Sequence, residues 1–373
     1  SIFGGSYGWA SAGRFHHAQS QLHRFLNCIG GYTRSKFTYS FAAAEAMVPH
    51  ILGSYRAFLD TCTSWDSIEE NTKLFICFGG VPLKNGQIAQ GGTGSHKQKE
   101  KLIRSANAGI KFINFSPLKS DLLDEVNGEW LALRPNTDVA IMLGLAHTLY
   151  KEKLYDDKFI EKYTEGFDTF LPYLLGDIDG IVKDANWASS ISEIPSKKII
   201  SLAKEMSSKR TMISVSWSLT RQDHGEQPFW AAIMLASMLG QIGLPGGGFG
   251  FGYSATNHIG GQFSIIPGAA FPQTENKIED FIPVARISDL LLNPGGSFDF
   301  DGKEYKYPDI KLIYWAGGNP FHHHQDINRL LQAWQKPETI ISNEWCWNSL
   351  AKYSDIILPC TTPLERQDIM LTP

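Results

Sequence analysis

Two short turns with the shared pattern Gly-Gly-x-Pro are the segments of this chain best suited to bind a nucleotide-like ligand. Gly79-Gly80-Val81-Pro82 and Gly317-Gly318-Asn319-Pro320 each end a run of apolar residues. Glycines at the carboxyl end of a buried strand let a ligand approach the backbone closely, and open α/β sheets bind nucleotides at this edge. The two copies predict two nucleotide-like sites or one ligand with two such ends, although two α/β turns can also be alike by chance.

A second group of candidates lies near the amino terminus, where Tyr7 and Trp9 stand among glycines and serines without a core-forming pattern. Loops that carry large aromatic side chains with polar atoms often line small-molecule pockets. The alternative is a surface loop whose aromatic rings pack on a neighbouring domain. Further along, Arg221 follows an apolar run that ends at Trp217. Polar groups at the carboxyl end of a strand are site candidates as well.

Other motifs are absent or weak. No glycine turn matches G-x-G-x-x-G after a strand or G-x-x-x-x-G-K-[ST], so an NAD or P-loop site is not supported. The five cysteines lack C-x-x-C and ferredoxin spacing, so no iron–sulfur cluster is expected in this stretch. His322-His323-His324 could suggest a metal site. Three adjacent residues cannot easily face one ion, so a polar loop with one hydrogen-bonding histidine is favoured.

Length and composition indicate a globular protein of two or three domains. The chain has 373 residues, 43% of them hydrophobic and 19% charged, and a net charge of −4. No basic block is present, so nucleic acid is not an expected partner. No apolar run reaches the length of about 18 residues that a membrane span needs. The chain starts at Ser1 without an initiator methionine, which suggests an internal piece of a longer protein.

The candidate residues must be positioned by alternating strands and helices. Apolar runs at 74–80 and 111–116, and again at 311–316 and 339–343, alternate with helical patterns. This order predicts the α/β fold class, with two doubly wound Rossmann-like domains, one inserted in the other. We expect residues 1–65 and 281–373 to form a discontinuous domain and 66–280 the inserted one. Smaller expectations are a helix at 41–52, a loop at 243–250 and a hairpin within 293–309.

Long motifs then occur in order along the chain, from Gly4 to Asp368. They include Gly5-Ser6-Tyr7-Gly8-Trp9, Thr38-Tyr39-Ser40, Thr137-Asp138-Val139-Ala140, Gly243-Leu244-Pro245-Gly246-Gly247-Gly248, Gly317-Gly318-Asn319-Pro320-Phe321, His323-His324-Gln325-Asp326 and Asp355-Ile356-Ile357-Leu358-Pro359. With these motifs the chain closely resembles the dimethyl sulfoxide / trimethylamine N-oxide / biotin sulfoxide reductase family of molybdopterin enzymes.

The resemblance implies a molybdenum ion held by two pterin guanine dinucleotides, the bis(molybdopterin guanine dinucleotide) cofactor, with one dinucleotide in each half of the fold. Ser40 is at the position of the serine that completes the metal's coordination. Tyr7 and Trp9 are implied to lie at the transferred oxygen, and Arg221 near the mouth of the substrate funnel. The implied reaction is oxygen-atom transfer from S-oxides or N-oxides, such as dimethyl sulfoxide, trimethylamine N-oxide, and biotin or methionine sulfoxide.

The resemblance also implies which residues contact the cofactor. In one half these are Gly80, Pro82, Ser116, Pro117, Thr137, Asp138, Trp217 and Gly247, and in the other Gly317, Gly318, Asn319, Pro320, His323, Gln325, Asn343 and Asp355. The family commonly has Asn-Pro followed by Thr-Glu-Thr where this chain has Ser116-Pro117 and Lys119-Ser120-Asp121. One dinucleotide is therefore expected to be held by somewhat different contacts.

Several properties are expected from the family alone. The electron donor is a protein, such as a c-type cytochrome, or a cytoplasmic reductant. A periplasmic location is favoured over a cytoplasmic one, and a monomer is expected. Family domains that flank this stretch contribute to the cofactor site and are absent from it. Tyr7 favours sulfoxides slightly, because trimethylamine N-oxide reductases tend to lack this tyrosine. The alternative is a non-catalytic or incomplete relative that binds the dinucleotide, and the presence of Ser40, Tyr7 and Trp9 argues against it.

Overall fold

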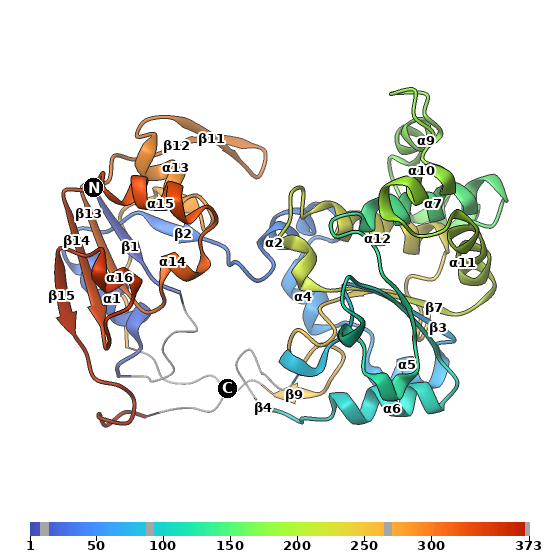
Figure 1. Cartoon of the computed structure of the whole chain (residues 1–373), viewed down its shortest axis with the longest axis horizontal. Coiled ribbons are helices and arrows are strands. Elements are labelled where there is room, and N and C mark those ends of the chain that lie inside the picture. Colours follow the sequence, from blue (N-terminus) through green and yellow to red (C-terminus); the bar gives the residue numbers. More distant parts are fainter. Residues whose placement is uncertain (8–14, 87–92, 265–270, 370–373) are drawn as a thin grey trace. The chain divides into compact units, whose positions relative to one another are not determined.

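The computed structural model describes residues 1–7, 15–86, 93–264 and 271–369, and the chain divides into two compact units (Figure 1). The first unit combines Ser1–Tyr39 with Ile266–Thr372, and the second is Ser40–Ile265. Each unit contains a sheet of parallel strands. The predicted α/β class is therefore confirmed, whereas the Rossmann-like arrangement stays a prediction.

The sheet of the first unit has four parallel strands. Their spatial order is β1 (Ile2–Gly5), β13 (Leu312–Ala316), β14 (Thr339–Glu344) and β15 (Ile356–Pro359). Because the strands are parallel, the turns that follow β1 and β13 meet at one edge. That edge carries Tyr7 and the glycine turn at 317–318.

Helices cover both faces of this sheet. Successive side chains of a strand point to opposite faces, so each face presents its own set of apolar residues to the helices. Helices α13 (Ile287–Leu292) and α15 (Ile327–Trp334) pack against one face, and α1 (Ala18–Cys28) packs against the other. The first face contributes Phe3, Ile313, Trp315 and Ile340, and the second contributes Ile2 and Tyr314. The remaining elements are α14 (Pro320–His323), α16 (Ser349–Lys352), β2 (Arg34–Lys36) paired with β10 (Phe281–Pro283), and β11 (Ser297–Phe300) paired with β12 (Lys303–Lys306).

The sheet of the second unit has five parallel strands. Their spatial order is β6 (Glu129–Leu131), β5 (Lys111–Phe115), β3 (Leu74–Phe78), β7 (Thr211–Val215) and β8 (Gly248–Phe251). Every residue of β3 and β7 is buried, as expected for central strands that are covered on both faces. The glycine turn at 79–80 follows β3 directly and so lies at the carboxyl edge of this sheet.

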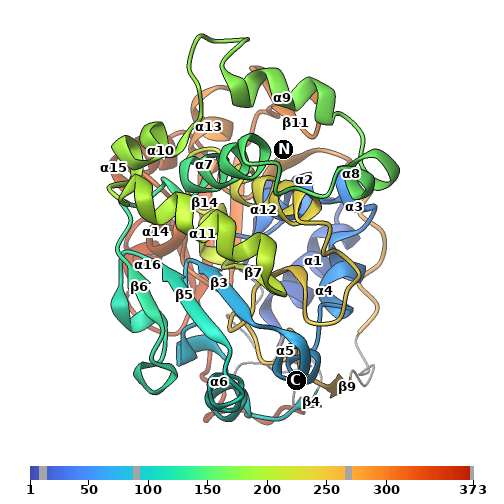
Figure 2. The ribbon, with the colours of Figure 1, turned by 90° about the vertical axis from the view of Figure 1, so that its right-hand side faces the viewer.

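Figure 2 looks onto the second unit and shows which helices cover each face of its sheet. Helices α5 (Trp65–Asn71) and α6 (Gln98–Asn107) lie below the strands. Above them lie α7 (Asp138–Lys151), α10 (Ala185–Ser192), α11 (Ser196–Ser208) and α12 (Gln227–Met238). The other elements of this unit are α2 (Ala42–Met47), α3 (Pro49–Leu52), α4 (Tyr55–Asp60), α8 (Asp157–Tyr163), α9 (Phe167–Leu175), β4 (Thr93–Gly94) and β9 (Phe263–Ser264).

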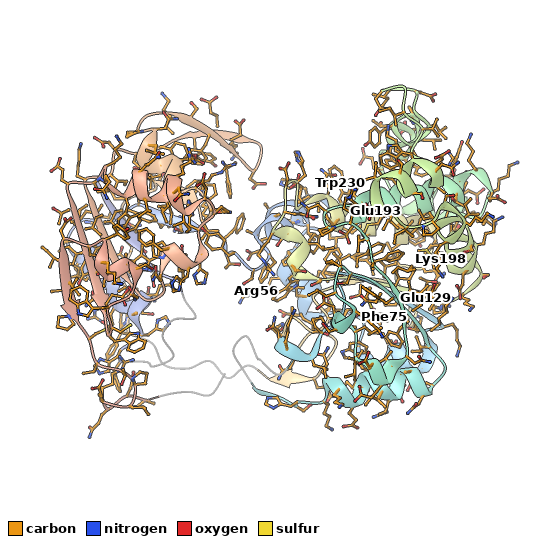
Figure 3. All side chains as sticks on the ribbon, in the orientation of Figure 1. Arg56, Phe75, Glu129, Glu193, Lys198 and Trp230 are labelled. Atoms are coloured by element: carbon orange, nitrogen blue, oxygen red, sulfur yellow. The ribbon has the colours of Figure 1, made fainter. Side chains whose placement is uncertain are left out.

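Aromatic packing and ion pairs tie the helices to this sheet. Phe75 of β3 lies inside the unit (Figure 3), with its ring centroid 5.7 Å from that of Trp65 and 5.2 Å from that of Phe112. The Lys198 ammonium lies 2.6 Å from the Glu129 carboxylate and links α11 to β6 (Figure 3). Among the described residues, no helix combines the length and apolar character needed to cross a membrane.

The structure corrects two of the predicted elements and confirms the hairpin at 293–309. The loop predicted at 243–250 was wrong at its end, because residues 248–251 form β8. There a Cβ on Gly250 would lie 3.0 Å from the side chain of Met212, so glycine at this position lets the strand fit a tight space, while Phe249 and Phe251 enter the core. The helix predicted at 41–52 is two short helices, with Pro49 opening the second. Proline cannot donate the backbone hydrogen bond that a continuous helix needs.

The boundaries between the units also differ from the predicted ones. They fall at 39/40 and 265/266 rather than at 65/66 and 280/281. Phe41 and Tyr55 belong to the buried core of the second unit, which holds their segment there. In the first unit, the Asn276 side chain accepts from the Tyr32 N–H at 3.2 Å and donates to the Tyr32 carbonyl at 2.8 Å.

Candidate functional site

The carboxyl edge of the sheet in the second unit brings together three of the predicted cofactor-binding segments. The Gly79 N–H donates to the Phe115 carbonyl at 2.8 Å, and the Ser216 N–H donates to the Phe78 carbonyl at 2.9 Å. These bonds continue the parallel ladder beyond the strands. The glycine turn, the Ser116-Pro117 turn and Trp217 therefore lie side by side at the ends of β3, β5 and β7.

The glycine turn of this unit has no room for a side chain. Gly80 has φ +76°, and a Cβ built there would lie 2.5 Å from the main-chain oxygen of Asp121. The Val81 N–H donates to the same oxygen at 2.8 Å. The Ser116 hydroxyl donates to the Asp121 carboxylate at 2.7 Å. Ser116 and Asp121, two of the residues that depart from the family pattern, thus hold each other and brace the turn that contains Gly80.

Asp138, the first residue of α7, is a buried carboxylate with an unsatisfied oxygen. Its side chain is 3% exposed, and its Oδ1 atom has no hydrogen-bond partner. Burial raises the pKa of Asp138 from 3.8 to about 7. The neighbouring Thr137 hydroxyl donates to the Arg134 carbonyl at 2.6 Å and so does not satisfy it. A buried oxygen of this kind is suited to receive a hydrogen-bond donor from a ligand.

The raised pKa of Asp138 predicts a pH-dependent stability. The folded chain favours the protonated form, so this group's contribution is most favourable below about pH 4 and is lost as the pH rises towards 7. We expect Asp138→Asn to stabilise the cofactor-free full-length protein more at pH 8 than at pH 5, by on the order of 2 kcal/mol. Urea denaturation at the two pH values measures this difference.

The matched control is Asp157→Asn, because Asp157 holds the same first-turn position in α8 but is exposed. Its effect on the free energy of unfolding should change little between the two pH values. An Asp138→Asn effect that is the same at pH 5 and pH 8 would contradict the assigned burial of the charge.

Ser40, the predicted metal ligand, is held through its main chain in the second unit. Its carbonyl oxygen accepts from Arg221 Nη1 at 2.8 Å and lies 3.3 Å from Thr220 Oγ1. The rings of Phe41 and Trp217 pack 4.3 Å apart beside this contact. Burial lowers the pKa of Arg221. Its hydrogen bond to the Ser40 carbonyl is a structural contact, and its place near the substrate funnel stays a prediction.

The carboxyl edge of the sheet in the first unit positions Tyr7. The Tyr7 N–H donates to the Gly317 carbonyl at 2.9 Å. Its ring centroid lies 5.0 Å from that of Trp315, 4.7 Å from that of His323 and 5.8 Å from that of Tyr39. On Gly318, which has φ +79°, a Cβ would lie 2.7 Å from the Tyr7 ring. The second glycine turn therefore supports the Tyr7 ring by close contact.

Other predicted residues of this unit gather at the same edge. Asn319 caps α14 by accepting from the Phe321 N–H at 2.9 Å, and it donates to the Ser349 hydroxyl at 2.9 Å. Pro320 and His323 begin and end α14, and Gln325 follows it as an exposed residue. Asn343 is the last β14 residue in register with β13.

The structure does not bring every predicted residue to these edges. Asp355 precedes β15, and its carboxylate accepts from the Ile340 N–H at 2.8 Å, at the amino end of β14. Gly247 precedes β8 and so lies at the amino end of the sheet in the second unit. Trp9 lies outside the described residues. Pro82, two residues after Gly80, is half-buried.

Two of the three adjacent histidines make hydrogen-bond contacts. His324 is buried and lies 3.0 Å from the Tyr39 hydroxyl and 2.9 Å from the Ser288 hydroxyl. His323 Nδ1 lies 3.2 Å from the Asn319 carbonyl, and His322 is exposed. Within the described ranges, no group of three or more His, Cys, Asp or Glu side chains is arranged to hold a metal ion.

Reasoning from the sequence alone missed Tyr39, His324, Ser288 and Asp121 as members of these sites. The available signals were the position of Tyr39 beside Ser40, the run of three histidines that contains His324, and the departure from the family pattern at Asp121. Ser288 lies in a short helix with no motif, and its contact with His324 spans 36 residues of chain. Such contacts leave no periodic pattern in the sequence.

Comparisons with known proteins agree on one family. A family model described as Molybdopterin oxidoreductase matches residues 1–372. The chain is 48% identical over 369 residues to a biotin sulfoxide reductase of Cereibacter sphaeroides, covering 99% of this chain and 50% of that protein. It is 43% identical to a dimethyl sulfoxide/trimethylamine N-oxide reductase of the same organism, covering 98% of this chain and 46% of that protein. A trimethylamine-N-oxide reductase of Haemophilus influenzae is also 43% identical, over 99% of this chain and 46% of that protein.

A solved structure supports the fold. Acetylene hydratase from Pelobacter acetylenicus superposes with a TM-score of 0.54 at 14% identity, covering 96% of this chain and 49% of that chain. At this identity the likeness concerns the fold alone. The chain spans about half the length of the curated relatives it matches.

Proposed function

Because the chain belongs to the molybdopterin oxidoreductase family, we propose that it forms a cofactor-binding part of an enzyme that reduces S-oxides or N-oxides by oxygen-atom transfer. The observation that carries this proposal is the 48% identity to a biotin sulfoxide reductase across nearly the whole chain. The family implies molybdenum and a molybdopterin cofactor.

We propose further that the cofactor is the bis(molybdopterin guanine dinucleotide) form, with one dinucleotide on each unit. Each unit has a parallel sheet whose carboxyl edge carries a Gly-Gly turn with positive φ at both glycines. In the second unit, the bare backbone at Gly80 would let a diphosphate approach closely. The unsatisfied Asp138 Oδ1 fits a guanine base, whose N1–H and 2-amino group both donate hydrogen bonds. These residues therefore fit the proposed group.

When bound, the cofactor supplies a molybdenum centre that exchanges an oxygen atom and two electrons with the substrate. The residues of the chain would hold and orient the reactants. Ser40 would supply a hydroxyl oxygen to the metal, with its backbone fixed by Arg221. The Tyr7 hydroxyl would donate a hydrogen bond to the oxide oxygen of the substrate and polarise it, an electrostatic role.

Other functions are less well supported. A nicotinamide-dependent dehydrogenase would need a G-x-G-x-x-G motif that this sequence lacks. A non-catalytic relative would not need Ser40, Tyr7 and Trp9 together. A preference for sulfoxides over N-oxides rests on Tyr7. The electron donor, the location and the monomeric state stay predictions from the family.

The test is to purify the full-length protein without oxygen and to measure its cofactor and its activity together. We expect two guanine nucleotides per molybdenum after acid hydrolysis. We also expect reduction of dimethyl sulfoxide, trimethylamine N-oxide or both with a reduced viologen dye. Guanine nucleotide without molybdenum would favour the non-catalytic relative. Molybdenum without oxide reduction would contradict the proposed reaction.

A further inference from the structure

A buried hydrogen-bond chain in the first unit connects α13 to the aromatic group around Tyr7. The Ser288 hydroxyl lies 2.9 Å from His324 Nε2, and the Ser288 N–H donates to the same nitrogen at 3.4 Å. His324 Nδ1 lies 3.0 Å from the Tyr39 hydroxyl, which donates to the Val284 carbonyl at 3.2 Å. Ser288 and His324 are 2% and 8% exposed, so water does not substitute for these bonds.

The donors and acceptors of this chain fix the tautomer of His324. A backbone N–H can only donate, so His324 Nε2 must accept from Ser288 and carry no proton. The neutral ring then carries its proton on Nδ1, and that proton points to the Tyr39 oxygen. Burial lowers the pKa of His324, which agrees with a neutral ring.

The fixed tautomer sets the direction of every bond at Tyr39. A carbonyl can only accept, so the single Tyr39 hydroxyl proton goes to Val284, and the Tyr39 oxygen accepts from His324. Tyr39 therefore has no proton to offer Tyr7, whose ring packs edge-on against it.

Tyr7 is left as a donor. Its hydroxyl is buried and makes no hydrogen bond of standard geometry, although the Tyr39 hydroxyl is close enough to affect its pKa. Burial, and then Tyr39, raise the pKa of Tyr7 far above its ordinary value, so the phenol keeps its proton. With no described protein donor facing its oxygen, Tyr7 acts only as a donor, to the nearby Tyr39 oxygen in the free protein and to a bound acceptor when one is present.

We propose that His324 is a positioning residue, which orients Tyr39 as an acceptor so that Tyr7 is held as a hydrogen-bond donor to an oxide oxygen. The oxide as acceptor rests on the proposed function. The direction of the hydrogen bonds among Ser288, His324 and Tyr39 does not depend on the proposed function. His324 acts through Tyr39 and makes no contact with substrate in this account.

The first arm of the test reads the tautomer and does not depend on activity. Full-length protein with 15N-labelled histidine is compared with a His324→Gln variant to assign the ring signals by NMR. The expected result is a protonated Nδ1 and an unprotonated Nε2 at neutral pH. A proton on Nε2, or on both nitrogens, would overturn the proposal.

The second arm uses two variants, each of which places a side-chain nitrogen near the position of a different ring nitrogen of His324. The side-chain nitrogen of Asn stands as many bonds from Cβ as His Nδ1, and that of Gln as many as Nε2. His324→Asn can still donate to Tyr39, whereas His324→Gln keeps only the position near Ser288. With dimethyl sulfoxide as substrate, we expect His324→Gln to lower kcat by about tenfold with little change in KM, the size of one hydrogen bond. His324→Asn should recover most of the rate.

A Tyr7→Phe background separates positioning from general support of the fold. There the hydroxyl is gone, so His324→Gln should change kcat by less than about twofold. A tenfold loss in that background, or equal losses for Asn and Gln, would overturn the proposal. If the wild-type protein reduces neither oxide, the proposed function fails, and the NMR result alone then decides whether the hydrogen-bond directions hold.

Discussion

Ser40→Ala in the full-length protein is expected to abolish oxide reduction while leaving the fold intact. The substitution removes only the hydroxyl oxygen. The bonds from Arg221 and Thr220 go to the Ser40 carbonyl, which alanine keeps. We expect kcat for dimethyl sulfoxide to fall at least about 100-fold, since loss of even an outer partner of a metal ligand costs 10- to 100-fold. The measurements are kcat, molybdenum content and the urea midpoint of the same preparation.

The matched control is Ser201→Ala. Ser201 is exposed on α11, and its hydroxyl donates to a carbonyl of the same helix. This variant should keep both activity and stability. Normal turnover by Ser40→Ala would refute the ligand assignment. A Ser40→Ala protein that unfolds at much lower urea would instead mean that the hydroxyl supports the fold.

Gly80→Ala is expected to destabilise the second unit strongly and to prevent cofactor binding. The residue has a positive φ, which costs a side chain about 1–2 kcal/mol. The added Cβ would also lie 2.5 Å from the main-chain oxygen and Cβ of Asp121, neither of which is the end of a flexible chain. Overpacking of this kind adds about 1–3 kcal/mol. We expect the cofactor-free full-length protein to lose about 3 kcal/mol in urea denaturation.

Gly109→Ala is the control that separates the two costs. Gly109 has a similar φ of +86° in the same unit, and a Cβ there meets nothing within 4 Å. Its loss should be about 1–2 kcal/mol, from the backbone conformation alone. Guanine nucleotide content should fall in Gly80→Ala and stay normal in Gly109→Ala. Equal losses of stability in the two variants would mean that the Asp121 contact does not restrict the turn.

Some predicted cofactor residues lie apart from the glycine turns, for a physical reason that is visible in particular residues. Gly247 and Asp355 lie in family motifs, yet the parallel register puts both at amino ends of strands, away from the glycine turns. A motif fixes a position along the chain, whereas the edge of a sheet depends on which strands pair. Residues 40–65, predicted to lie in the discontinuous domain, group with the second unit in the structure. A short, weakly periodic segment does not show in the sequence which core its apolar side chains enter.

The sequence by itself determined the family, the α/β class and the two glycine turns at strand ends, because these depend on local order and on residue type. Buried apolar runs and glycines are readable without knowing their neighbours. Only the tertiary structure decided how Tyr7, Tyr39, His324 and Ser288 are linked. Tyr39 and His324 are 285 residues apart, and their bond exists because the helices and turns around one sheet bring them together. Hydrogen-bond direction depends on such contacts, so it follows from the folded geometry.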